Sequence, residues 1–184
     1  VSLEKTLEAT KNQQLKDLKR RVNQVASDQE RLRKNHETEP VSDSDASSNQ
    51  LFADQQKGLE SETRRATELA NAILEKADME TRNALAEARD HLKEASYWMD
   101  KAAEQMSEGN PSTVEMAHGA IREQLQKAKT QLDSLADSSD LNKLDRLTEA
   151  LKSIQEAKSE LARSEGEQEG QGRGERLGPG TKEA

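Results

Sequence analysis

The chain has 184 residues and a formal net charge of −8, and 35% of its residues are charged while only 31% are hydrophobic. One Phe, one Tyr and one Trp are too few aromatic residues for a compact α/β or all-β core, and the absence of cysteine excludes disulfides, zinc–thiolate sites and cysteine nucleophiles. The chain is rich in strong helix formers such as Ala, Leu, Glu, Lys and Gln. The composition therefore predicts an all-α protein, in which long antiparallel helices form a slim helical bundle or coiled coil with an extended N-terminal helix and a disordered C-terminal tail.

Residues 1–36 are predicted to form one long basic amphipathic helix of roughly 50 Å. Its apolar positions follow the 3–4 spacing of a coiled coil, with Gln29 at one of them. The full series is Leu15, Leu18, Val22, Val25, Gln29 and Leu32. Leu3 and Leu7 lie out of this phase, so the pattern shifts near the start.

Residues 37–50 are predicted to be a solvated linker, because Pro40 ends a helix and the Ser/Asp run has little to bury. An antiparallel helical bundle is then expected over 51–163. Its first two helices are predicted at about 51–77 and 79–108, and Asp78 marks either a turn between them or a bend in one continuous helix. The second has the most regular pattern, which is Leu85, Ala88, Leu92, Ala95, Met99, Ala102 and Met106.

Gly109 and Asn110-Pro111 predict the next helix boundary, since Gly favours the end of a helix and Pro its first turn. Further helices are expected at about 111–136 and 141–163. The short connections predict that the helices from residue 79 to 163 form a three-helix, up-down-up unit. Residues 164–184 are rich in Gly and Glu and are predicted to be a disordered tail.

Candidate metal chemistry is confined to the Glu115-x-x-His118 pattern, which occurs in di-metal carboxylate bundles. Such a site needs a second motif of this kind, and neither His36 nor His91 has an acidic residue three positions earlier. His118 is therefore interpreted as a histidine at the edge of the apolar stripe, and His91 as part of a charged, solvated face. We expect no metal and no cofactor.

Catalytic motifs are also missing from the sequence. It contains no Gly-rich phosphate loop and no nucleophile elbow, and a narrow bundle offers little volume for a substrate pocket. We expect a protein that is not an enzyme and has no small-molecule substrate.

Two surface features are candidate binding sites. Tyr97 and Trp98 form the only aromatic pair, which either covers the flank of the core or binds a protein partner. The basic residues of the first helix either form a solvated coiled-coil face, pair with the chain's own acidic residues, or contact an anionic surface such as lipid headgroups, nucleic acid or an acidic partner. These basic residues are Lys19, Arg20, Arg21, Arg31, Arg33 and Lys34.

Residues 55–135 resemble a Gln/Glu/Ala-rich helical region of large membrane-anchored bacterial envelope proteins, whose function is not established. The resemblance rests on Gln55, Gln56, Leu59, Thr63 and Leu69, on Ala88, Leu92, Ala95, Met99, Ala102 and Met106, on Gly109, and on Ala117, Ala120, Gln124, Ala128 and Leu132. It implies an assembly role on the envelope or periplasmic side, and a cytoplasmic location is expected otherwise.

Four functions follow as hypotheses. The first is a non-catalytic scaffolding or protein-interaction module, with a protein partner or self-association. The second is an adaptor that docks an anionic surface, the third a di-metal carboxylate bundle, and the fourth a segment that folds on binding its partner. No apolar run approaches the roughly 20 residues that cross a bilayer, and no signal peptide is recognised. The first residue is Val1, which is compatible with a piece of a longer protein.

Overall fold

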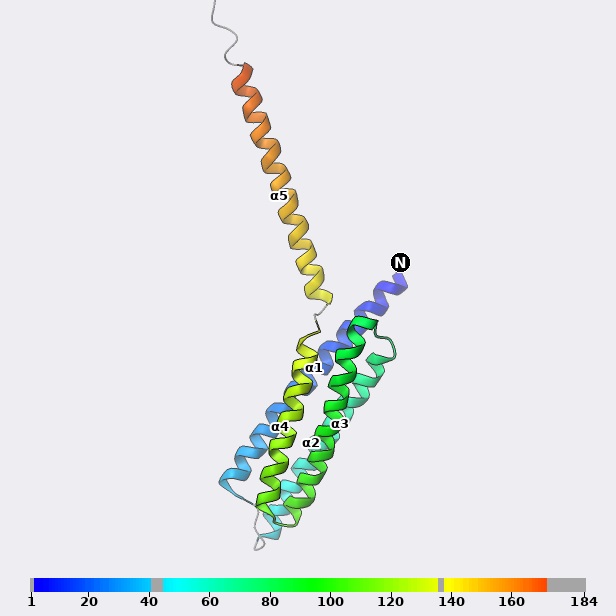
Figure 1. Ribbon diagram of the computed structural model, residues 1–184, viewed down its shortest axis with the longest axis vertical. Coiled ribbons are helices and arrows are strands. Elements are labelled where there is room, and N and C mark those ends of the chain that lie inside the picture. The colour runs from blue at the N-terminus through cyan, green and yellow to red at the C-terminus, as the bar shows by residue number, and fades with distance from the viewer. Residues whose placement is uncertain (1, 41–44, 136–137, 172–184) are drawn as a thin grey trace, which may run out of the picture. The chain divides into compact units, whose positions relative to one another are not determined.

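The computed structural model describes residues 2–40, 45–135 and 138–171, which contain five helices and no strand (Figure 1). The predicted all-α fold is confirmed. The chain divides into two units, residues 1–137 and residues 138–184, and each is described here by itself.

Four long helices make up the first unit. They are α1 (Ser2–Thr38), α2 (Ala46–Leu74), α3 (Met79–Ser107) and α4 (Pro111–Asp133). Their ends follow local chemistry. Asp45 caps α2 by accepting a hydrogen bond from the backbone N–H of Ser48, and Asp78 caps α3 in the same way through Thr81. Asp78 therefore begins a new helix, which settles the choice between a turn and a bend.

The turn between α3 and α4 depends on Gly109, whose φ of 70° lies in the left-handed region. In this turn the N–H of Gly109 donates to the carbonyl of Met106, and that of Asn110 donates to the carbonyl of Gln105. This pair of bonds satisfies carbonyls at the end of α3. Pro111 then occupies the first turn of α4, where no backbone N–H is needed.

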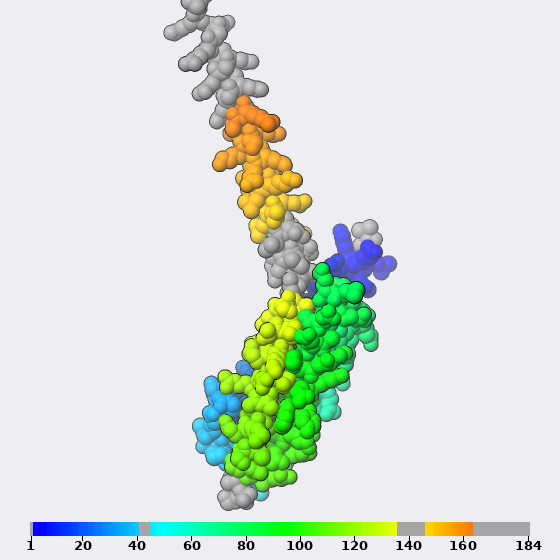
Figure 2. Space-filling view, in the orientation of Figure 1, coloured from blue at the N-terminus to red at the C-terminus, as the bar shows by residue number. Residues whose placement is uncertain are grey.

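The helices run alternately up and down, and each packs against two neighbours (Figure 1). α2 packs on α1 and α3, while α4 packs on α3 and α1. Figure 2 shows α3 and α4 side by side on one face of this unit. The result is a four-helix bundle with short connections.

The core lies along the stripes that the sequence predicts. All seven residues of the α3 pattern are fully buried, and Ala88, Ala95 and Ala102 leave room for the neighbouring helices to approach closely. The stripe of α1 from Leu15 to Leu32 is buried as well. The first turns of α1, residues 2–10, are exposed.

The four-helix bundle contains α1, which was not part of the predicted three-helix unit. We expected a three-helix unit over residues 79–163, but the structure forms a four-helix bundle in which α1 packs on α2 and α4. The seven-residue connection from 39 to 45 lets α1 fold back along α2, and the α1 stripe then covers the remaining apolar edges of α2 and α4. Residues 141–163 belong to the second unit, and their packing in a bundle stays a prediction.

The second unit contains α5 (Ser138–Gln171). Its described side chains, from Arg146 to Arg163, are all exposed. α5 begins before the predicted residue 141 and continues through residues 164–171, which we expected to belong to a disordered tail; residues 172–184 lie outside the described part.

The linker is also shorter than predicted, since α1 reaches Thr38 and α2 begins at Ala46. Residues 41–44 of that linker are not described. None of the helices in the described part is both long and apolar enough to cross a membrane.

Candidate functional site

A buried polar layer crosses the bundle between α1, α2 and α4. Gln29 and Gln56 exchange two amide hydrogen bonds, at 3.0 Å from Gln29 Nε2 to Gln56 Oε1 and at 2.8 Å in the reverse direction. The second amide hydrogen of Gln29 points to His118 Nδ1, at 3.1 Å. All three side chains are at most 4% exposed. Three helices are thus tied together by polar contacts inside the core.

The contact with Gln29 fixes the state of His118. An amide NH₂ can only donate, so Nδ1 accepts and the neutral ring carries its proton on Nε2. Nε2 is buried and has no hydrogen-bond partner among the described residues. The His36 ring lies beside it, with ring centroids 5.5 Å apart in an edge-to-face arrangement, and the Phe52 ring makes a similar contact with His36 at 5.6 Å.

Burial controls the protonation of both histidines. It lowers the pKa of His118 from 6.5 to about 4, helped by the charge of Arg33 and, when His36 is protonated, by the charge of His36. Burial also lowers the pKa of His36, while the Glu115 carboxylate opposes that shift. Both imidazoles are therefore neutral at pH 7.

The sequence interpretation of His118 as an edge residue is wrong, because its side chain is only 2% exposed. α1 packs over the edge of the α4 stripe and supplies Gln29 and His36 as neighbours. The signal that could have found this layer was Gln29 itself, a polar residue in an apolar series. Its partner Gln56 carries the same signal on α2, since it lies four residues after Phe52 and three before Leu59.

The Glu115-x-x-His118 pattern does not assemble a metal site in the described part of the chain. Glu115 is exposed whereas His118 is buried. No group of three or more His, Asp or Glu side chains among the described residues is arranged to hold an ion. His91 is partly buried, and its Nδ1 lies 2.8 Å from Gln124 Oε1, which can only accept; His91 thus donates across to α4.

The first basic cluster of α1, Lys19, Arg20 and Arg21, makes hydrogen bonds and ion pairs within the chain. Lys19 donates to the backbone carbonyl of Leu135 at 2.7 Å and so ties α1 to the end of α4. The two arginines face carboxylates instead. The pairs are Arg20–Asp17 at 3.2 Å and Arg21–Glu62 at 3.9 Å.

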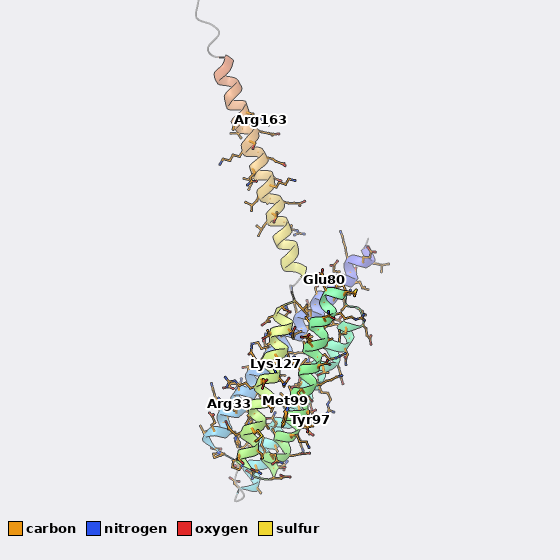
Figure 3. All side chains as sticks on the ribbon, in the orientation of Figure 1. Arg33, Glu80, Tyr97, Met99, Lys127 and Arg163 are labelled. Carbon is orange, nitrogen blue, oxygen red and sulfur yellow. The ribbon has the colours of Figure 1, made fainter. Side chains whose placement is uncertain are left out.

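In the second basic cluster, Arg31, Arg33 and Lys34, both arginines also form ion pairs within the chain. Arg31 pairs with Asp28 at 3.3 Å, and Arg33, labelled in Figure 3, pairs with Glu30 at 2.8 Å and also with Glu37. Hydrogen bonding to Arg33 lowers the pKa of Glu30, and the charge of the exposed Lys34 adds to the effect. Lys19, Arg20, Arg21, Arg31 and Arg33 thus each have a hydrogen-bond or ion-pair partner within the chain.

The aromatic pair divides into one core-flanking and one exposed residue. Trp98 is partly buried against the core, and its Nε1–H donates to Glu94 at 3.2 Å. Tyr97 is 53% exposed, stands edge-on to Trp98 with centroids 5.5 Å apart, and has the ammonium of Lys101 6.0 Å from its ring centre. Figure 3 labels Tyr97 and the fully buried Met99 on α3. Trp98 therefore covers the flank of the core, and Tyr97 is the member that solvent reaches.

The largest set of exposed apolar side chains lies on α5. We call it the α5 stripe and define it as Leu147, Leu151, Ile154 and Leu161. Their exposed fractions lie between 61% and 63%. The intervals of 4, 3 and 7 match those of the buried stripes of the bundle, so α5 carries a coiled-coil pattern that the described residues of its own unit leave exposed.

No family model, no curated protein and no solved structure matches this chain.

Proposed function

We propose that the chain is a non-catalytic scaffolding module that binds another protein chain through the α5 stripe. The observation that carries this proposal is the contrast between the helices. The apolar stripes of α1 to α4 are buried in the bundle, while the same pattern on α5 is more than 60% exposed.

The physical reason is that an isolated helix in water is only marginally stable, and most helices in proteins are held by packing of an apolar face. A partner that covers Leu147, Leu151 and Ile154 supplies that packing.

Two other surfaces are weaker candidates for binding a partner. Tyr97 offers one exposed ring, which is a small contact compared with four aliphatic side chains in line. Docking to lipid or nucleic acid through α1 is weakened by the carboxylates that already face its arginines. The resemblance of residues 55–135 to envelope proteins supports an assembly role at the bacterial envelope, which fractionation of the native cell would test.

The proposal is tested by photo-crosslinking in the native cell. A photoreactive amino acid replaces Leu151 on the stripe or, as the matched control, Lys152 on the opposite face. We expect crosslinks to another protein chain from position 151 and few from position 152. Equal crosslinking from both positions, or none from either, would refute the proposal.

A further inference from the structure

We infer that the partner of the α5 stripe is a second copy of this chain, paired antiparallel through α5. This inference rests on the proposed function, since it names the occupant of the same surface.

The first argument concerns charge on the faces of α5. With Leu147, Ile154 and Leu161 at heptad position d, Leu151 and Lys158 fall at position a. Between Arg146 and Arg163, where the side chains of α5 are described, the positions that flank this seam, e and g, hold no charge: Thr148, Ala150, Gln155, Ala157 and Ala162. Charged residues at e and g are the usual means by which a coiled coil selects a different partner and rejects itself.

The second argument is that the seam complements itself. Leucine and isoleucine fill four of the five a and d positions from Leu147 to Leu161, so a copy of α5 presents the same apolar pattern that it must cover. The remaining charges between Arg146 and Arg163 lie at the outer positions b, c and f, where they do not meet across a pair. They are Arg146, Glu149, Lys152, Glu156, Glu160 and Arg163.

The third argument sets the direction. In a parallel pair, Lys158 would face Lys158 of the second copy inside the seam, which is unfavourable because like charges are brought together. In an antiparallel pair centred between Leu151 and Ile154, each Leu151 meets Ile154 of the second copy. Lys158 then lies beside Leu147 of the second copy, where its aliphatic stem packs and its ammonium reaches water. Ala150 and Ala157 at position g let the two helices approach closely.

Light scattering on the purified full chain tests self-association. We expect a mass that reaches twice the 20.5 kDa of the chain as concentration rises. The double substitution Leu151→Glu/Ile154→Glu places two carboxylates in the seam and should weaken association by at least ~100-fold. The matched control Ser153→Glu/Ser159→Glu adds the same charge at positions c and b and should associate like the wild type.

Spin-label distances test the direction, and the chain has no cysteine that would interfere. Single labels at Glu149→Cys and Arg163→Cys lie on the outer face. At ~1.5 Å per residue, an antiparallel pair separates the two labels along the axis by about 10 Å at position 149 and about 32 Å at position 163. A parallel pair gives no axial separation at either position.

The results separate the two proposals. Equal distances at both positions would overturn the antiparallel arrangement, and a dimer that survives Leu151→Glu/Ile154→Glu would overturn the assigned surface. A chain that stays monomeric at all concentrations, but crosslinks a different protein from position 151 in the cell, would overturn the inference and leave the proposed function standing. A monomer without crosslinks would overturn both.

Discussion

Replacement of His118 by Gln should make the bundle less sensitive to acid. His118 is buried in the polar layer, where its Nδ1 accepts from Gln29 and its pKa is lowered from 6.5 to about 4. In the unfolded chain the imidazole takes up a proton near its ordinary pKa, whereas in the folded bundle it stays neutral until about pH 4. Acid therefore favours the unfolded state over this interval.

The size of the effect follows from the shift. A pKa change of ~2.5 units corresponds to ~3 kcal/mol at ~1.36 kcal/mol per unit. The titration of His118 does not lower the free energy of unfolding above pH 6.5. It lowers this free energy progressively as the pH falls to about 4, and it causes no further loss below that pH. His36 contributes in the same direction, because its pKa is also lowered. A loss of ~3 kcal/mol is a large part of the 5–15 kcal/mol that stabilises a typical domain.

Urea unfolding followed by circular dichroism at pH 7.5, 5.5 and 4.5 measures this dependence. The comparison of wild type with His118→Gln cancels the titration of groups that both proteins share. Val114→Ala is the matched control, since Val114 is fully buried on the same helix but cannot titrate. It should lower the free energy of unfolding by a similar amount at each pH.

The expected result is that His118→Gln loses less stability than wild type between pH 7.5 and 4.5, by up to ~3 kcal/mol. If the variant and the wild type lose the same stability over this interval, His118 is not held neutral by burial and the reasoning is refuted.

Three further predictions concern packing and backbone. Gln29→Ala should cost ~1–3 kcal/mol in urea unfolding at pH 7, since it leaves Gln56 and Nδ1 of His118 without their hydrogen bonds; a double-mutant cycle with Gln56→Ala that shows strict additivity would contradict this. Gly109→Ala should lower stability by ~1–2 kcal/mol in a thermal melt, because φ is 70° there, and an unchanged melt would contradict that reason. Ala95→Leu should cost ~1–3 kcal/mol by overfilling the fully buried contact of α3, and a stabilised variant would show that the helices have space to move apart.

The bundle helices were predictable because each carries its own evidence of burial. The 3–4 spacing from Leu85 to Met106 predicts which face of α3 is covered, whatever covers it. The turn at Gly109 and the boundary at Asp78 follow from local backbone and capping chemistry, which acts over a few residues.

The pairing of the helices was not predictable in the same way. The stripe of α5 has the same spacing as those of the bundle, and nothing in the periodicity tells a covered stripe from an exposed one. The burial of His118 was not predictable from its own helix either. Its burial depends on α1, and its contact with Gln29 spans 89 positions in the sequence, so the pattern of α4 alone placed it at an edge. The same cause hid the contact of Gln29 with Gln56.

The polar layer also determines how far along α2 and α4 the first helix sits. The apolar series of α1 repeats every seven residues, so a slide by one heptad, ~10 Å along the axis, would return apolar side chains to equivalent places. Gln29 would then face Asn49 or Thr63, which lie seven residues on either side of Gln56 and are also buried. Gln56 and His118 would both lose the amide that bonds them. Register is thus selected by one glutamine pair and one imidazole, as a single polar residue selects it in a coiled coil.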